Sequence, residues 1–195
     1  MKLLNKKEMP ELDIRKNRRE FLAMGFVSAG ALLIPDKILA AVKEIPAEKK
    51  LSLYNPRSHD NLETVFWKDG RYVPGALSKI NYMFRDSRTG EVTEINKKLL
   101  EFLYSIQQKL KTKEPIHLIS GYRSPRSNAL LRKRRKGVAK NSFHMYGKAV
   151  DVRIPGCSLK SVRRAAMSCE IGGVGYYPRS KFVHLDVGDV RYWWG

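Results

Sequence analysis

Three residues of the sequence, His144, Asp151 and His184, have the types and spacing of a metal-binding set. Two imidazoles and one carboxylate form a suitable ligand combination for a catalytic zinc ion, with a fourth position left open for water. Their spacing completes no local metal-binding motif, so the alternative is a surface histidine and two strand residues that never meet. From spacing alone, the metal site is a hypothesis that needs these segments to meet in the fold.

The segments around Asp151 and His184 alternate between apolar and other residues, which is typical of half-buried strands. We expect each strand to turn its apolar side chains to a core and its possible ligand to the opposite face. Gly147 allows the chain to turn between His144 and the first of these strands. The apolar positions are Val150, Val152 and Ile154 in one segment and Val183, Leu185 and Val187 in the other.

Turn signals, capping residues and apolar periodicity predict the other elements. Asp69-Gly70 predicts a hairpin turn, and Asn96 is placed to cap a helix that Pro115 ends. The glycine-rich segment 172–175 is interpreted as the turn before the last strand. Hairpins together with segregated helices indicate an α+β domain. Strands are expected at 51–54, 62–67, 71–73 and 116–120, and helices at 76–84, 96–110, 125–134 and 158–167.

The N-terminal 41 residues have the pattern of an export signal. Arg18-Arg19 precedes Phe21-Leu22 and an uncharged stretch over 21–34, which is shorter than the roughly 20 residues that span a bilayer. Paired arginines in this position are typical of a twin-arginine signal. The alternative is an uncleaved anchor or a basic amphipathic segment. We expect a signal sequence over 1–41, a linker over 42–50, a single domain over 51–195 and a periplasmic protein without stable membrane insertion after export.

The chain is strongly basic, with a formal net charge of +19. Eight Lys and Arg and five Asp and Glu fall within residues 1–41, so the remainder keeps an excess of 16 positive charges. The densest run extends from Arg123 to Lys140 and contains no acidic residue. Such a surface attracts polyanions, which outside the inner membrane are the cell wall and anionic lipid or polysaccharide. A solvated helix face without a partner is the alternative.

Cys157 and Cys169 flank a segment with helical character that Ser158 is placed to cap. About twelve residues of helix extend roughly 18 Å at ~1.5 Å per residue. A disulfide requires Cα atoms within roughly 7 Å of each other. The sequence therefore predicts two free thiols with a structural role.

Several motifs together resemble the periplasmic murein endopeptidase K group, zinc peptidases related to D-alanyl-D-alanine carboxypeptidases and dipeptidases. The resemblance covers nearly the whole chain, from the leader to the C-terminal tryptophans. It is carried by Ser120-Gly121-Tyr122-Arg123-Ser124, Gly137-Val138-Ala139-Lys140, Ser142-Phe143-His144, Gly147-Lys148-Ala149-Val150-Asp151, and the segment 172–186 that ends in Val183-His184-Leu185-Asp186.

This resemblance implies a single zinc ion held by His144, Asp151 and His184. It implies a small antiparallel sheet that carries the zinc site with helices packed against it, of the D-Ala-D-Ala metallopeptidase and hedgehog type. The implied substrate is a peptide cross-link of peptidoglycan, either between D-alanine and diaminopimelate or between two diaminopimelates. We expect a monomer whose partner is peptidoglycan and not nucleic acid, because the leader predicts export and the sequence has no recognised nucleic-acid-binding module.

Two further residues are candidates for catalysis. Arg123 follows a predicted strand, and the related peptidases place such an arginine beside the reaction intermediate; the alternative is one more member of the basic run. Relatives carry an acidic residue or histidine as general base just before the last ligand, where this chain has Lys181, Phe182 and Val183. Asp186 lies two positions after His184, on the same strand face. It could accept the proton as the base or orient a ligand histidine.

Two functions from different classes follow. The first is a zinc-dependent murein endopeptidase that hydrolyses peptidoglycan cross-links by a metal-activated water. The second, suggested by the missing base, is a non-catalytic wall-binding module that keeps zinc for folding.

Overall fold

The computed structural model describes residues 46–135 and 137–195 of the chain. The predicted signal sequence lies outside the described residues. Strand β1 (Glu48–Asn55) begins inside the segment predicted as a linker. No helix in the described ranges is both long and apolar enough to cross a membrane.

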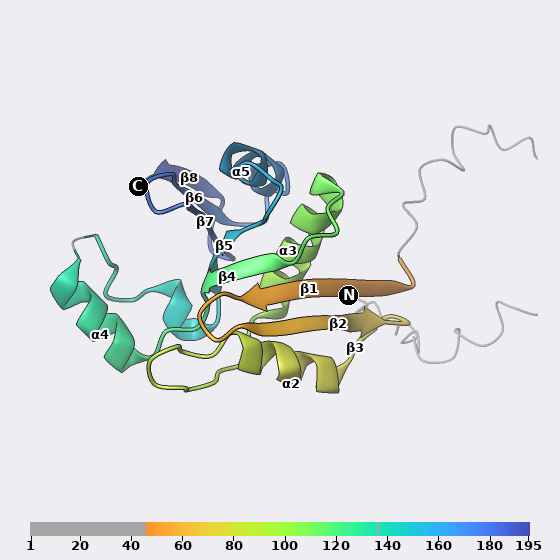
Figure 1. Cartoon of the computed structure of the whole chain (residues 1–195), viewed down its shortest axis with the longest axis horizontal. Helices are drawn as coiled ribbons and strands as arrows, with labels where there is room; N and C mark the ends of the chain where they lie inside the picture. The colour runs from red at the N-terminus through yellow and green to blue at the C-terminus, as the bar shows by residue number, and fades with distance from the viewer. Residues whose placement is uncertain (1–45, 136) are drawn as a thin grey trace, which may run out of the picture. The chain divides into compact units, whose positions relative to one another are not determined.

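The described residues form one mixed sheet of eight strands with helices against it (Figure 1). Along the sheet the strands lie in the order β3-β2-β1-β4-β5-β7-β6-β8. The other strands are β2 (Asp60–Lys68), β3 (Arg71–Tyr72), β4 (Ile116–Ser120), β5 (Ala149–Arg153), β6 (Gly173–Tyr177), β7 (Phe182–Asp186) and β8 (Arg191–Trp194).

The prediction of a small antiparallel sheet is wrong in size and in direction, although the α+β mixture is confirmed. Strand β1 pairs in parallel with β4, and β6 pairs in parallel with β8. The first pair is parallel because two helices lie between β1 and β4 and return the chain to the same end of the sheet. Residue alternation reports which side chains are buried, and it contains no information on strand direction.

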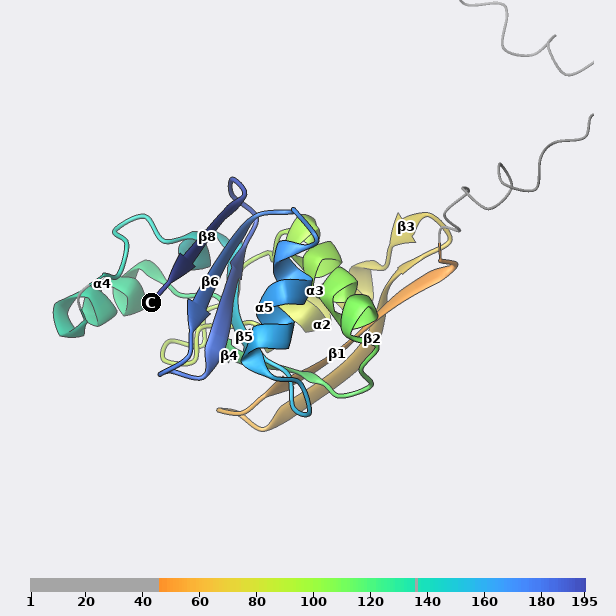
Figure 2. The same cartoon turned by 90° about the horizontal axis from the view of Figure 1, so that it is seen from above.

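Helices α3 (Lys97–Leu110) and α5 (Leu159–Met167) pack against each other, and α2 (Pro74–Met83) packs on β2. Figure 2 shows these three helices together on one side of the curved sheet. The apolar face of β5 and β7 is buried in the core with them, as the alternation predicts. Its members are Val150, Val152, Val183 and Leu185.

Local capping signals predicted two helix starts correctly. The Asn96 side chain accepts a hydrogen bond from the Lys98 backbone N–H at 2.9 Å. The Ser158 hydroxyl accepts one from the Ser161 backbone N–H at 3.1 Å. Each cap satisfies a backbone donor that has no partner inside the helix. With α5 between them, Cys157 and Cys169 are free thiols.

The segment 172–175 is not a turn, which corrects the prediction. Its residues from Gly173 onward form β6, between β7 and β8. A Cβ atom on Gly175 would lie 2.5 Å from Cε2 of Trp193. Glycine is therefore needed here because the indole ring crosses this position, and not because the backbone bends.

Candidate metal centre

His144 is held in place by a short 3-10 helix, η1 (Phe143–Tyr146), that ends at Gly147. Gly147 has φ 61°, and a Cβ atom there would lie 2.3 Å from the Glu94 carbonyl oxygen, so a side chain does not fit. The imidazole Nδ1 lies 2.8 Å from the Gly121 carbonyl oxygen. Because a carbonyl oxygen only accepts, Nδ1 donates this hydrogen bond, and Nε2 is the ring nitrogen that remains for a metal ion.

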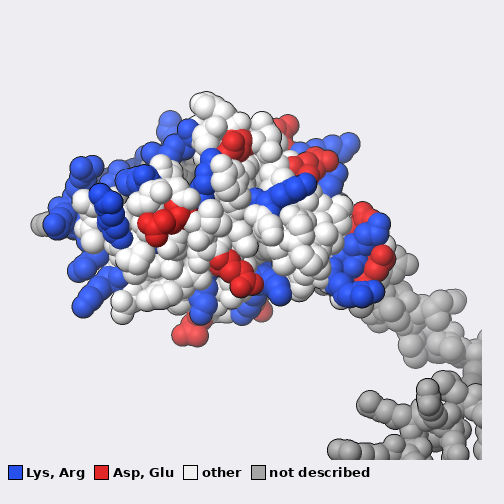
Figure 3. All heavy atoms as spheres, turned by 90° about the horizontal axis from the view of Figure 1, so that it is seen from below, with Lys and Arg blue, Asp and Glu red and all other residues white. Residues whose placement is uncertain are grey.

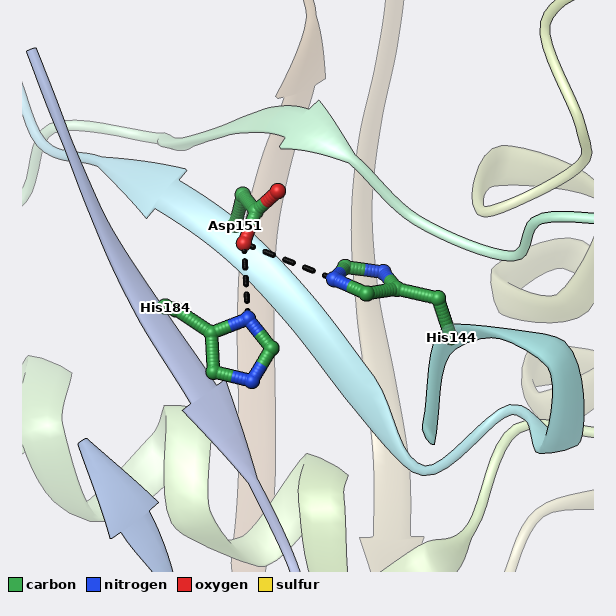
Figure 4. Close-up of side chains that lie close together, drawn as sticks. All are labelled: His144, Asp151 and His184. Carbon is green, nitrogen blue, oxygen red and sulfur yellow. Dashed lines mark hydrogen bonds and ion pairs between the residues drawn. The ribbon is translucent and has the colours of Figure 1, made fainter. Parts of the chain in front are cut away.

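The ligand candidates from β5 and β7 face each other directly across two paired strands. Asp151 is the cross-strand partner of His184. Asp151 Oδ1 lies 2.9 Å from His184 Nδ1 and 3.5 Å from His144 Nε2, and Figure 4 shows both imidazoles turned toward this one oxygen. The sequence hypothesis that these three residues never meet is thereby excluded.

The three groups fit a small tetrahedral metal ion. One ligand atom from each residue lies within 4.8 Å of the others. Tetrahedral zinc with N and O ligands at about 2.0–2.1 Å has ligand atoms about 3.3 Å apart, and the two distances from Asp151 Oδ1 to the histidine nitrogens, 2.9 and 3.5 Å, lie on either side of this value. His144 and Asp151 are buried and His184 is half-buried. Such a site needs little rearrangement to accept the ion.

Asp186 is fully buried beneath His184. Its Oδ2 lies 3.1 Å from His184 Nε2 and accepts a hydrogen bond from Arg191 at 2.7 Å. Its Oδ1 accepts hydrogen bonds from Arg191 at 3.0 Å and from the Gly188 backbone N–H at 2.9 Å. Both oxygens are therefore engaged, and the carboxylate directs Nδ1 of His184 toward Asp151.

The buried charges at the site compensate one another. Burial alone would raise the pKa of Asp151, but the charges and hydrogen bonds of both histidines outweigh it and hold that pKa well below its usual range. Burial alone would lower the pKa of His184, yet the hydrogen bonds to Asp151 and Asp186 raise it to about 9. Without a metal, His184 therefore carries a proton that an arriving cation displaces.

Arg123 is brought to the same place by the turn between β4 and α4 (Pro125–Arg134). Its backbone N–H donates to the His144 carbonyl oxygen at 3.1 Å, and its guanidinium donates to Asn128 Oδ1 at 3.3 Å. Burial lowers the pKa of the guanidinium, and the attraction of Asp151 opposes this shift. Arg123 thus lines the same cleft as the ligand set.

This cleft has a volume of about 890 Å³ and is lined by all three ligand candidates, Arg123 and Asp186. Its walls are rich in cations and include Arg57, Arg85, Arg88, Arg135 and Arg191. His59 and His117 do not line it. His59 lies at the turn between β1 and β2, where its Nδ1 is 3.0 Å from the Tyr54 hydroxyl. His117 lies on β4, and its ring centroid is 4.7 Å from that of Tyr54.

Two residues at the site were missed from the sequence. Trp193 lies across Gly175 with its ring centroid 5.3 Å from that of His184, and its indole N–H donates to the Tyr177 hydroxyl at 2.9 Å. Asp86 is buried, and its Oδ2 accepts a hydrogen bond from the Ser124 backbone N–H at 2.7 Å. Trp193 carries no local signal, because its hydrogen-bond partner Tyr177 lies 16 positions away. The Asp86-Ser87-Arg88-Thr89-Gly90 segment does have a turn signal, since Asp86 Oδ1 accepts a hydrogen bond from the Arg88 backbone N–H at 2.8 Å, but its contact with Ser124 is visible only in the fold.

Asp86 anchors the turn that carries Arg123, and we expect Asp86→Ala to lower the free energy of unfolding by about 1.5–3 kcal/mol. Burial would raise the pKa of Asp86, but the nearby Ser127 side chain and the hydrogen bonds from the Arg88 and Ser124 backbone N–H groups lower it. A carboxyl group with a depressed folded-state pKa stabilises the fold above its unfolded pKa and loses this effect as pH falls.

Urea unfolding of Asp86→Ala and the unaltered protein tests this at neutral and at acidic pH. The difference in free energy of unfolding between the two proteins should shrink as pH falls through the folded-state pKa of Asp86. Asp189 is exposed, so Asp189→Ala is the control. An equal loss of unfolding free energy in both variants would contradict the anchoring role of Asp86.

Asp186→Asn should weaken metal binding about 10- to 100-fold, the usual effect of removing a group that orients a ligand histidine. The amide has one acceptor oxygen in place of two and no negative charge. Competition with a chromogenic chelator measures the affinity. Asp189→Asn is the matched control, since it removes the same charge from a nearby exposed residue. Unchanged affinity in Asp186→Asn would refute the orienting role.

Comparison with known proteins gives a consistent result. A family model described as peptidoglycan L,D-endopeptidase MepK matches residues 43–193. The peptidoglycan L,D-endopeptidase MepK of Escherichia coli K12 is 42% identical over 177 residues, covering 91% of this chain and 97% of that protein. A Haemophilus influenzae protein described as a probable peptidoglycan L,D-endopeptidase MepK is 39% identical over 183 residues, covering 93% of this chain and 98% of that protein.

Proposed function

The chain belongs to the MepK family of peptidoglycan L,D-endopeptidases, and from this premise we propose that it is a zinc-dependent murein endopeptidase of the periplasm. It is a hydrolase that cleaves peptide cross-links of peptidoglycan. The names of its relatives favour the L,D bond between two diaminopimelates over the D,D bond between D-alanine and diaminopimelate. The twin-arginine pattern at Arg18-Arg19 supports export of the folded protein to the wall.

One observation carries the proposal: Nε2 of His144, Oδ1 of Asp151 and Nδ1 of His184 converge at the cleft. The remaining ring nitrogen of each histidine is already engaged, by the Gly121 carbonyl oxygen and by Asp186. Both imidazoles are therefore fixed with the atom needed for metal binding directed inward. We assign one zinc ion to these three ligands. A bound zinc ion would lower the pKa of a water molecule to about 7 and polarise the scissile carbonyl.

Arg123 is proposed to stabilise the negative charge that develops on the carbonyl oxygen during attack. Its guanidinium is held by Asn128 and lies in the cleft with the ligand set. A cation fixed before the reaction stabilises developing charge without the cost of reorientation. The arginine-rich walls would also raise the local concentration of peptides that carry free carboxylates.

For Asp186 we propose the orienting role and not that of the general base. A base must reach the proton that it removes, whereas the Asp186 side chain is fully buried and both of its oxygens already accept hydrogen bonds. Burial alone would raise the pKa of Asp186, but the hydrogen bonds with His184 and Arg191 lower it to about 2, so this carboxylate is a weak proton acceptor.

Mass analysis of cross-linked muropeptides after incubation with the zinc-loaded protein tests the function. Conversion of diaminopimelate-linked dimers to monomers is expected, and the masses identify the bond that is cut. The rival function, a wall-binding module with structural zinc, is suggested by the absence of an available base. It gives intact dimers together with a lower melting temperature on metal removal.

A further inference from the structure

Cations gather on α4 and on the loop that follows it. The sequence contains no acidic residue between Glu114 and Asp151, and Figure 3 shows Lys and Arg concentrated at the end of the molecule where α4 lies in Figure 1. We call this region the α4 basic surface. It consists of the exposed residues Arg126, Arg132, Lys133, Arg134, Arg135 and Lys140.

The charges of the α4 basic surface have no acidic partners within residues 46–135 and 137–195. In that part of the chain, lysines at the far end of the sheet are paired, for example Lys49 with Glu101 at 2.7 Å and Lys68 with Glu48 at 2.6 Å. None of the ion pairs found there includes a residue of the α4 basic surface. Its positive potential is therefore available to an external anion.

Helix α4 contributes little to the core. Its buried residues are the polar Ser127 and Asn128. The Asn128 side-chain amide donates to the carbonyl oxygens of Ala139 and Lys140, both at 3.1 Å, which ties the helix to the following loop. A helix fixed by hydrogen bonds, with its cations outward and no apolar face packed inside, is suited to a role at the surface.

The α4 basic surface is continuous with the active-site cleft. Leu131 and Arg135 belong to α4 and its C-cap, and they line the same cleft as His144. A polymer with one peptide bond beside His144 can therefore also contact Arg135 and, beyond it, the outer side of α4. A small soluble substrate confined to the cleft does not reach that outer side.

We propose that the α4 basic surface binds free carboxylates of peptidoglycan outside the cleft and so holds the enzyme on the intact wall. This rests on the function proposed above. The stem peptides of peptidoglycan carry several free carboxylates, and the wall repeats them in every direction. An anionic membrane is the poorer match, since helices that lie in a membrane surface bury a broad apolar face. Leu130 is the one large apolar residue exposed on α4.

The test is the triple substitution Arg132→Gln, Lys133→Gln and Arg134→Gln in the full chain. Co-sedimentation with purified sacculi, in the cold and at increasing salt, should show binding weakened about tenfold or more, with a shallower salt dependence. Cleavage of soluble cross-linked dimers should stay within about twofold of the unaltered protein, because none of the three residues lines the cleft.

The matched control removes the same charge from exposed positions on α3 and α5, through Lys98→Gln, Lys160→Gln and Arg164→Gln. If both triple variants weakened sacculus binding equally, binding would depend on net charge alone and the proposal would be overturned. Unchanged sacculus binding in the α4 triple variant would also overturn it. If the α4 triple variant lost binding to phosphatidylglycerol vesicles but kept binding to sacculi, the proposal would also be overturned, in favour of a membrane-binding surface. Failure of the unaltered protein to cut soluble dimers would refute the proposed function alone, since the sedimentation comparison still decides the role of α4.

Discussion

Cleavage of cross-linked muropeptides is expected to fall to background, at least about 1,000-fold, in each of His144→Ala, Asp151→Ala and His184→Ala. A metal ion supplies several kcal/mol of transition-state stabilisation, and each 1.4 kcal/mol is a factor of ten in rate. The loss should be accompanied by loss of bound zinc, measured by elemental analysis of the purified variants. The physical cause is the removal of one of three converging ligand atoms.

The exposed His59 supplies the matched control, because it lies away from the cleft and accompanies Tyr54 instead. His59→Ala should keep both its zinc and its activity. Chelation of the unaltered protein should abolish cleavage, and added zinc should restore it. A chelated protein that cuts dimers at the full rate would rule out the zinc mechanism, whatever the variants do.

Arg123→Gln should lower kcat by about 100- to 1,000-fold, the usual cost of losing one donor that stabilises a developing oxyanion. The KM for soluble dimers should change little, because the interaction strengthens as charge develops and not when substrate binds. Zinc content and melting temperature should stay close to those of the unaltered protein. Steady-state kinetics on a soluble dimer separates kcat from KM.

The control for Arg123 is Arg126→Gln, an exposed member of the same basic run that does not line the cleft. If Arg123 served only as one more cation of the run, both variants would lose activity to the same small extent. A fall in kcat/KM that comes from KM alone would likewise count against the assigned role. Arg123→Lys adds a graded measurement, since a lysine keeps the charge and loses the planar fork of donors.

Local signals in the sequence predicted most of the elements correctly. Alternation around Asp151 and His184 predicted two strands with their apolar side chains in the core, and Asn96 and Ser158 predicted helix starts. These signals succeed because side-chain direction and capping depend on neighbours within a few residues. The sequence also identified the three ligand candidates, through their residue types and their resemblance to known zinc peptidases.

The tertiary structure decided what depends on distant partners. The parallel pairing of β1 with β4 and the anchoring of the Arg123 turn by Asp86 each involve residues far apart in the chain. The position of Asp186 on the correct strand face was predictable, but its burial and its contact with Arg191 were not. Hydrogen-bond partners and burial are properties of the folded arrangement, because the long-range contacts that create them leave no periodic trace in the local sequence.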